Sequence, residues 1–131
     1  MPYAERTKIP PNRTRQQIED LMRRRGADQF YSGSNLDSAI LVFRLQGRHF
    51  RFVLPLGQKM PEQKIRARWR ALFLAIKARL ESIDAGITTL EEAFLPETVL
   101  PDRHTVAEVM APQIEAAYQS GTMPPLLEHH R

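Results

Sequence analysis

The stretch Ala39–Leu54, AILVFRLQGRHFRFVL, decides the fold. Its two halves, Ala39–Leu45 and Arg48–Leu54, are rich in β-branched, aromatic and aliphatic side chains, which favour β-strands. Only Gln46-Gly47 separates them, and two such runs joined by two residues ending in glycine predict a β-hairpin. Pro55 is expected to end the second strand, because proline cannot donate a hydrogen bond to the ladder.

The two-residue loop also predicts the register and the two faces of the hairpin. Leu45 pairs with Arg48, every following pair keeps this offset, and successive side chains alternate between the faces. One face is wholly apolar and is expected to face the core: Leu41, Phe43, Leu45, Phe50, Phe52 and Leu54. The other face mixes apolar with basic or titratable side chains: Ile40, Val42, Arg44, His49, Arg51 and Val53.

A long amphipathic helix is predicted between Pro61 and Gly86. Apolar residues recur there at steps of three and four, which is the period of one helix face: Ile65, Trp69, Leu72, Phe73, Ile76, Leu80 and Ile83. The helix should span about 25 residues, roughly 37 Å. We expect its apolar stripe to cover the aromatic face of the hairpin.

Shorter elements complete an α+β fold. Thr14 and Gln17 form a capping-box pattern before a short helix over Arg15–Arg25, and Ala27–Tyr31 is a short strand candidate. The predicted architecture is an N-terminal helix, a three-stranded antiparallel sheet, the long helix packed on the sheet, and short C-terminal helices. Capping-box patterns open these last helices: Thr88 or Thr89 with Glu91 or Glu92, and Thr105 with Glu108.

The chain of 131 residues fits a single domain with tails. Residues 1–13 contain three prolines and read as a flexible basic arm. The α+β domain is expected over residues 14–127, and residues 128–131 form a tail. Within the domain, Met123–Leu127 is expected to dock as an extended apolar segment, and Pro112 either kinks the last helix or restarts it.

Composition narrows the function classes. No cysteine is present, which excludes disulfides, thiol catalysis and cysteine-ligated zinc. No apolar run approaches the roughly 18–20 residues of a membrane span, and no signal-peptide core is seen at the N-terminus. No histidine has a partner at ligand spacing, and no Gly-rich phosphate loop occurs. We therefore expect a cytoplasmic protein that is not an enzyme and that needs neither metal nor cofactor.

Charge is distributed unevenly along the chain. Residues 1–80 hold 17 Lys and Arg against 6 Asp and Glu, whereas residues 81–131 hold 2 against 9. Such asymmetry suggests a basic surface that meets a polyanion. The alternative is that the two halves attract each other within one fold.

Five arginines are the candidate nucleic-acid-binding residues. Arg44 and Arg51 share the outer face of the hairpin, and Arg48 lies beside the turn. Arg66 and Arg70 lie one turn apart on the long helix, where a row of cations could neutralise several phosphates. The hypothesis is that all five line one groove. The alternatives are a solvated helix face and a sheet face covered by the C-terminal helices.

Several strings together resemble a family of small uncharacterised proteins encoded by bacteriophages and prophages. The resemblance covers most of residues 14–127, and its strings are Arg25–Phe30, Gly47–Pro55, Trp69–Leu72, Ile76–Ala78, Gly86–Thr89 and Pro112–Tyr118, with Gly121, Met123 and Pro124. It implies a role in DNA metabolism or in interference with host defence, and no catalytic residue is carried over.

The leading hypothesis is a non-enzymatic nucleic-acid-binding protein of phage type. Its ligand is expected to be single-stranded DNA, in replication or recombination in the host cytoplasm. The alternative is a protein–protein inhibitor of a host defence or nuclease system. A structural building block that forms a homo-oligomer is a third hypothesis.

Overall fold

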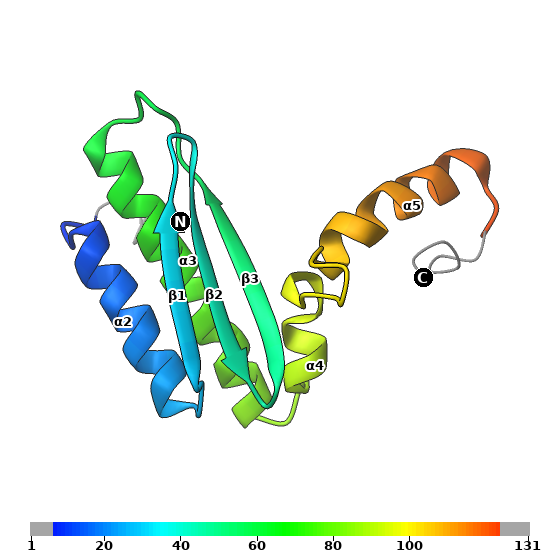
Figure 1. Cartoon of the computed structure of the whole chain (residues 1–131), viewed down its shortest axis with the longest axis horizontal. Helices are drawn as coiled ribbons and strands as arrows, with labels where there is room; N and C mark the ends of the chain where they lie inside the picture. The colour runs from blue at the N-terminus through cyan, green and yellow to red at the C-terminus, as the bar shows by residue number, and fades with distance from the viewer. Residues whose placement is uncertain (1–6, 124–131) are drawn as a thin grey trace.

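The computed structural model describes residues 7–123 and has the predicted α+β architecture (Figure 1). A helix, a three-stranded sheet and a long helix are followed by short helices and a projecting last helix. In chain order the elements are α2 (Pro11–Arg24), β1 (Gln29–Ser34), β2 (Ser38–Leu45), β3 (Arg48–Pro55), α3 (Glu62–Asp84), α4 (Leu90–Ala93), the 3₁₀ helix η1 (Leu95–Glu97) and α5 (Val106–Ser120).

The sheet is antiparallel with strand order β1-β2-β3. The predicted hairpin register is confirmed, since Leu45 pairs with Arg48 and Phe43 pairs with Phe50. Gln46 and Gly47 have φ angles of 53° and 77°. Positive φ at both loop positions is typical of a type I′ turn, whose twist matches that of the flanking strands.

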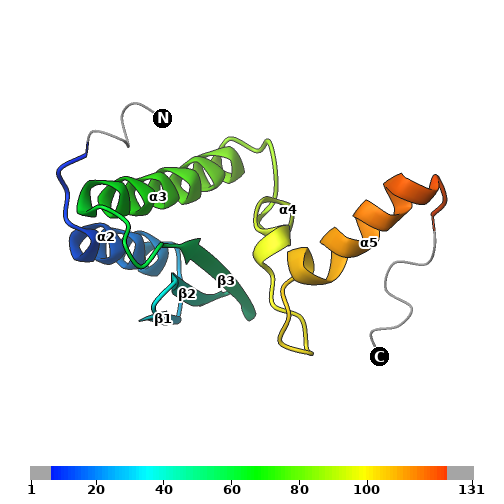
Figure 2. The same cartoon turned by 90° about the horizontal axis from the view of Figure 1, so that it is seen from above.

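Helices α2 and α3 lie side by side on one face of the sheet (Figure 2). Five of the six hairpin residues predicted to face the core are buried there, with Phe43 and Phe50 fully enclosed, and Leu54 is partly buried against the same cluster. Ile76 of α3 and Ile18 of α2 belong to the same apolar cluster. The long helix therefore covers the aromatic face as predicted, and α2 shares that face with it.

A cluster of phenylalanine rings forms the centre of the core. The Phe43 ring lies 5.5 Å from Phe50 and 5.9 Å from Phe52, measured between centroids. Phe94, which follows α4, sets its edge against Phe43 and Phe52 at 6.1 and 6.0 Å. These separations fall in the range preferred by aromatic pairs. Segment α4 thus brings a fourth ring to a core built by the hairpin.

The start of α2 differs from the prediction. The helix begins at Pro11, whose fixed φ suits the first helical position. Thr14 is therefore not the cap: it lies in the first turn and is fully buried on the core side. The flexible arm predicted for residues 1–13 is wrong at residues 11–13, which are helical.

The first strand also lies further along the chain than predicted. It spans Gln29–Ser34, because the turn into β2 is made by Asn35–Asp37. The Asn35 side-chain oxygen accepts hydrogen bonds from the backbone N–H of Asp37 and of Ser38, each at 2.8 Å. Asparagine commonly stabilises turns in this way.

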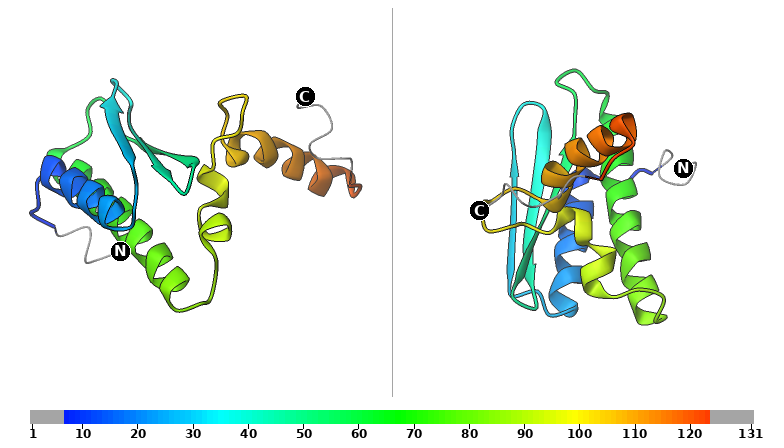
Figure 3. Two further views of the ribbon diagram at one scale, coloured as in Figure 1. Left: turned by 60° about the horizontal axis from the view of Figure 1, so that its bottom comes forward. Right: turned by 90° about the vertical axis from the view of Figure 1, so that its right-hand side faces the viewer.

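The last helix projects from the body of the molecule (Figures 1 and 3). It opens with the predicted capping box of Thr105 and Glu108, and α4 opens with that of Thr89 and Glu92. Helix α5 continues through Pro112 to Ser120. Within residues 7–123 no helix has the length and apolar character needed to cross a bilayer. The apolar segment predicted to dock extends beyond Met123, outside the described residues.

Candidate nucleic-acid interface

The five candidate arginines do not line one groove. Arg44 and Arg51 lie on the outer face of the hairpin, opposite the buried Phe43 and Phe50. Arg66 and Arg70 lie on α3, which packs on the other face (Figure 2). The sheet separates the two sets, because the apolar stripe of α3 docks on the core face while the hairpin arginines point away from it. The single-groove hypothesis is therefore wrong.

The arginines at the outer face and turn have carboxylate partners. The Arg44 guanidinium holds both oxygens of Asp28, with Nε 2.9 Å from Oδ1. This hydrogen bonding lowers the pKa of Asp28. Beside the turn, Arg48 Nη2 lies 3.9 Å from Glu91 Oε1. Carboxylates within the fold therefore neutralise much of the positive charge that the sequence predicts to contact a polyanion.

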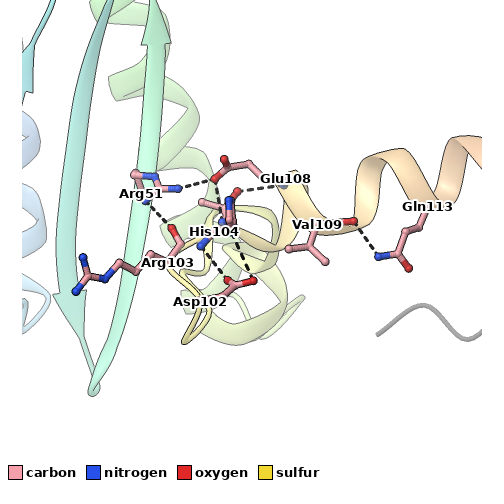
Figure 4. A network of polar contacts seen from close by, with 8 residues as sticks. Arg51, Asp102, Arg103, His104, Glu108, Val109 and Gln113 are labelled. Carbon is pink, nitrogen blue, oxygen red and sulfur yellow. Dashed lines mark hydrogen bonds and ion pairs between the residues drawn. The ribbon is translucent and has the colours of Figure 1, made fainter. Parts of the chain in front are cut away.

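Arg51 connects the sheet to the start of α5 (Figure 4). Its Nη2 lies 2.5 Å from Glu108 Oε1, and its Nη1 donates to the backbone carbonyl of Arg103 at 3.0 Å. The backbone N–H of Thr105 also donates to the Glu108 carboxylate, and this bond is the main cause that lowers the pKa of Glu108, with Arg51 adding to it. Arg51 therefore has a structural role in holding α5.

This attachment should weaken in acid. The pKa of Glu108 is lower in the folded state than its ordinary value of about 4.3, so its stabilisation is present above that value and is lost as the pH falls through the lowered pKa. Glu108→Ala should loosen α5 at neutral pH by about 1 kcal/mol, because the carboxylate is half exposed. Hydrogen exchange of the α5 amides should then be roughly five-fold faster, whereas Glu115→Ala should leave it unchanged. Equal exchange in both variants would contradict the role of Glu108.

Ion pairs join the basic and acidic halves of the chain. Each pair takes its arginine from residues 1–80 and its carboxylate from residues 81–131. The pairs are Arg25–Asp84 at 2.6 Å, Arg48–Glu91 at 3.9 Å, Arg51–Glu108 at 2.5 Å and Arg79–Glu97 at 2.5 Å. The uneven charge along the sequence therefore reflects, in part, attraction within the fold.

A second group of basic side chains lies on α2 and α3, which run parallel. Arg70 Nη1 donates to Gln17 Oε1 at 2.9 Å, which places residues 53 positions apart at the same level of the two helices. The Arg25–Asp84 pair, 59 positions apart, joins the C-terminal ends of the same two helices. The offset of 53 places Arg13 near Arg66, and Arg24 and Lys77 lie further along the same flanks of α2 and α3. We call Arg13, Arg24, Arg66, Arg70 and Lys77 the α2–α3 seam.

Both helices present the seam positions at the same spacing. Arg66, Arg70 and Lys77 lie at i, i+4 and i+11, and so do Arg13, Gln17 and Arg24. This spacing keeps the side chains on one flank of each helix. Eleven residues of helix extend for about 16 Å. The seam is thus a short double row of cations between two rigid elements.

The seam is less compensated than the outer sheet face. Arg13, Arg24 and Lys77 are exposed and make no ion pair with a carboxylate in residues 7–123. Arg66 pairs with Glu62 at 2.9 Å, whereas Arg70 lies 4.5 Å over the Phe73 ring and bonds only an amide oxygen. Sequence reasoning missed Arg13 and Arg24, although the spacing shared by the two helices was a usable signal.

The two exposed tyrosines of the described chain lie outside the seam. Tyr31 on β1 is 64% exposed and Tyr118 on α5 is 85% exposed. The Phe73 ring is covered by the guanidinium of Arg70. The seam can therefore offer charge and hydrogen-bond donors to phosphates, but no free ring for stacking on bases.

Residues 7–123 contain no group of three or more histidine, aspartate or glutamate side chains placed to hold a metal ion.

Comparison of the chain with models of protein families, with curated proteins and with solved structures finds no match. The function must therefore be inferred from the geometry of the chain itself.

Proposed function

We propose that this protein binds nucleic acid without catalysing a reaction, and that the α2–α3 seam contacts the phosphates. The observation that carries the proposal is the contact of Arg70 with Gln17 between two parallel helices, whose facing flanks carry five cations from distant parts of the sequence. Two of the five, Arg66 and Arg70, were candidate residues from the sequence. Arg44, Arg48 and Arg51 are not proposed as direct contacts, because each is held by a carboxylate from a distant part of the chain. The carboxylate partner of Arg66, Glu62, is exposed and lies one turn away on the same helix.

Phosphate contact explains why the seam needs cations and no base-reading groups. Arginine and lysine that neutralise phosphates release condensed counterions, and this term is independent of sequence. Helix-borne side chains keep their spacing, so the double row is pre-organised for a backbone of regular charge. Single-stranded DNA is the ligand we propose, in phage replication or recombination, because a flexible strand can follow a seam only about 16 Å long.

Binding should be steeply dependent on salt. Fluorescence anisotropy with a labelled oligo-dT strand should give a log–log slope near −0.7 for each phosphate contacted, and so about −2 to −3.5 for three to five contacts. A mixed-sequence strand should bind with similar affinity, and a duplex of the same length should bind more weakly. Affinity that does not change between 50 and 300 mM salt would count against the proposal, as would a strong preference for one sequence.

A specific observation favours a second function, binding to a protein. Helix α5 exposes Ile114 (44%), Tyr118 (85%) and the following Met123 (77%). In the described part of the chain, these residues help to line a hollow of about 500 Å³. A partner such as a host defence protein or nuclease would bury this apolar surface. This alternative is favoured if the wild-type protein has no affinity for oligonucleotides at moderate salt.

A further inference from the structure

The two edge strands of the sheet, β1 and β3, differ in how far other segments of the chain cover them. The edge of β3 is partly covered by its own chain, because Val99 N–H donates to the His49 carbonyl at 2.8 Å and Thr98 bridges to Phe50. Strand β1 pairs only with β2, and within residues 7–123 no segment lies along its other side. The free edge is visible as the outermost strand beside β2 in Figure 1.

Alternation along β1 identifies the backbone groups that point outward. Asn35 N–H donates to the Ser38 carbonyl at 2.9 Å, in the same register as the β1–β2 ladder. Hydrogen-bonded pairs recur at every second residue of an antiparallel ladder, so Gln29, Tyr31 and Gly33 use their N–H and C=O groups toward β2. Those of Phe30, Ser32 and Ser34 therefore point away from the sheet.

We propose that β1 pairs with β1 of a second copy of this chain, antiparallel about a two-fold axis at Ser32. Pairing at this register matches Ser32 with Ser32 of the partner subunit and matches Phe30 with Ser34 of the partner subunit. All three outward-facing residues then exchange both of their backbone hydrogen bonds. The product is one continuous six-stranded sheet, and the same patch serves both copies, as a two-fold interface requires.

The side chains of β1 fit a second copy of the same strand. QFYSGS contains no charged residue and no proline, the devices that usually protect a free edge from pairing. Self-pairing therefore brings no like charges together along the strand. Tyr31 falls opposite Gly33 of the partner subunit, so its ring meets a position without a side chain. The tyrosine already lies over Gly33 of its own strand, since a Cβ built there would be 2.8 Å from the hydroxyl.

Removing one outward N–H tests the pairing without touching β2. Ser32→Pro deletes a donor that the β1–β2 ladder does not use, and proline is tolerated on edge strands at such positions. The full-length wild type should show twice the monomer mass in light scattering or sedimentation at 100 μM, Ser32→Pro should show the monomer mass, and Ser32→Thr should behave as wild type. A monomeric wild type at this concentration would overturn the proposal, and so would a folded Ser32→Pro that remains dimeric.

Cross-linking tests the register independently of stability. Residue 32 is the only outward position that faces itself, with a Cα–Cα distance expected near 5.5 Å, inside the range of a disulfide. Because the chain has no native cysteine, Ser32→Cys should give a covalent dimer on mild oxidation with diamide, whereas Ser34→Cys should give at least tenfold less. Equal cross-linking of the two variants would overturn the register, and no cross-linking at 32 would overturn the interface.

Discussion

Phe94→Ala should lower the free energy of unfolding by about 3–5 kcal/mol, the usual cost of truncating a buried phenylalanine. The ring is fully buried and lies 5.6–6.1 Å, between centroids, from Phe43, Phe50 and Phe52. Its loss would open a cavity between the end of α4 and the hairpin. Urea denaturation followed by Trp69 fluorescence measures the change, because Trp69 lies in the same core.

The matched control is another aromatic residue placed outside the core. Tyr118 is 85% exposed, so Tyr118→Ala should change the free energy of unfolding by less than about 0.5 kcal/mol. If Phe94→Ala stayed within 1 kcal/mol of the wild type, α4 would not be a functional part of the core, and its placement against the hairpin would be wrong.

Reversing charge at the seam should have the largest effect on binding. Arg24→Glu with Lys77→Glu removes two phosphate contacts at positions that are exposed and make no ion pair in the described chain. At a slope of 0.7 for each contact, one contact contributes about eight-fold between 1 M and 50 mM salt. The double variant should therefore bind oligo-dT roughly 60-fold more weakly at 50 mM salt, and its salt slope should fall by about 1.4.

The control variant changes the net charge of the protein by the same amount, at positions outside the seam. Lys59 and Arg103 are both exposed and lie in loops outside the α2–α3 seam, so Lys59→Glu with Arg103→Glu should retain most of the affinity and the full salt slope. A loss equal to that of the seam variant would show that net charge, and not the seam, determines binding. Arg51 and Arg70 are poor choices for such a test, because both make contacts that hold elements together.

The parts of the fold that depend on local chemistry were predictable. The Gln46-Gly47 loop fixed the hairpin register, because two residues with positive φ allow only one pairing of the strands. The unbroken apolar period from Ile65 to Ile83 gave the long helix, observed as Glu62–Asp84. Thr105 with Glu108 gave the start of α5, since each side chain satisfies the other's backbone.

The parts that depend on distant contacts were not predictable in the same way. From the sequence alone, Arg44 and Arg51 are candidate phosphate ligands, but the fold places the carboxylates of Asp28 and Glu108 beside them. Arg13 and Arg24 share the spacing of Arg66 and Lys77 in the sequence, but they acquire their importance only when α2 docks parallel to α3, and no local pattern sets that docking. The start of α2 was misplaced because Thr14 with Gln17 imitates a cap, while burial of Thr14 against the core outweighs its capping preference.

The composition of the core also has a consequence for how the molecule melts. The main apolar cluster ends at Phe94 and contains no residue of α5, and the contacts of Arg51 that hold α5 to the sheet are polar. Cooperativity requires shared burial, so α5 and the preceding loop should unfold as a separate unit at lower temperature. In scanning calorimetry the total heat absorbed should then exceed the van't Hoff enthalpy of the main transition, as expected when a protein does not melt in one step.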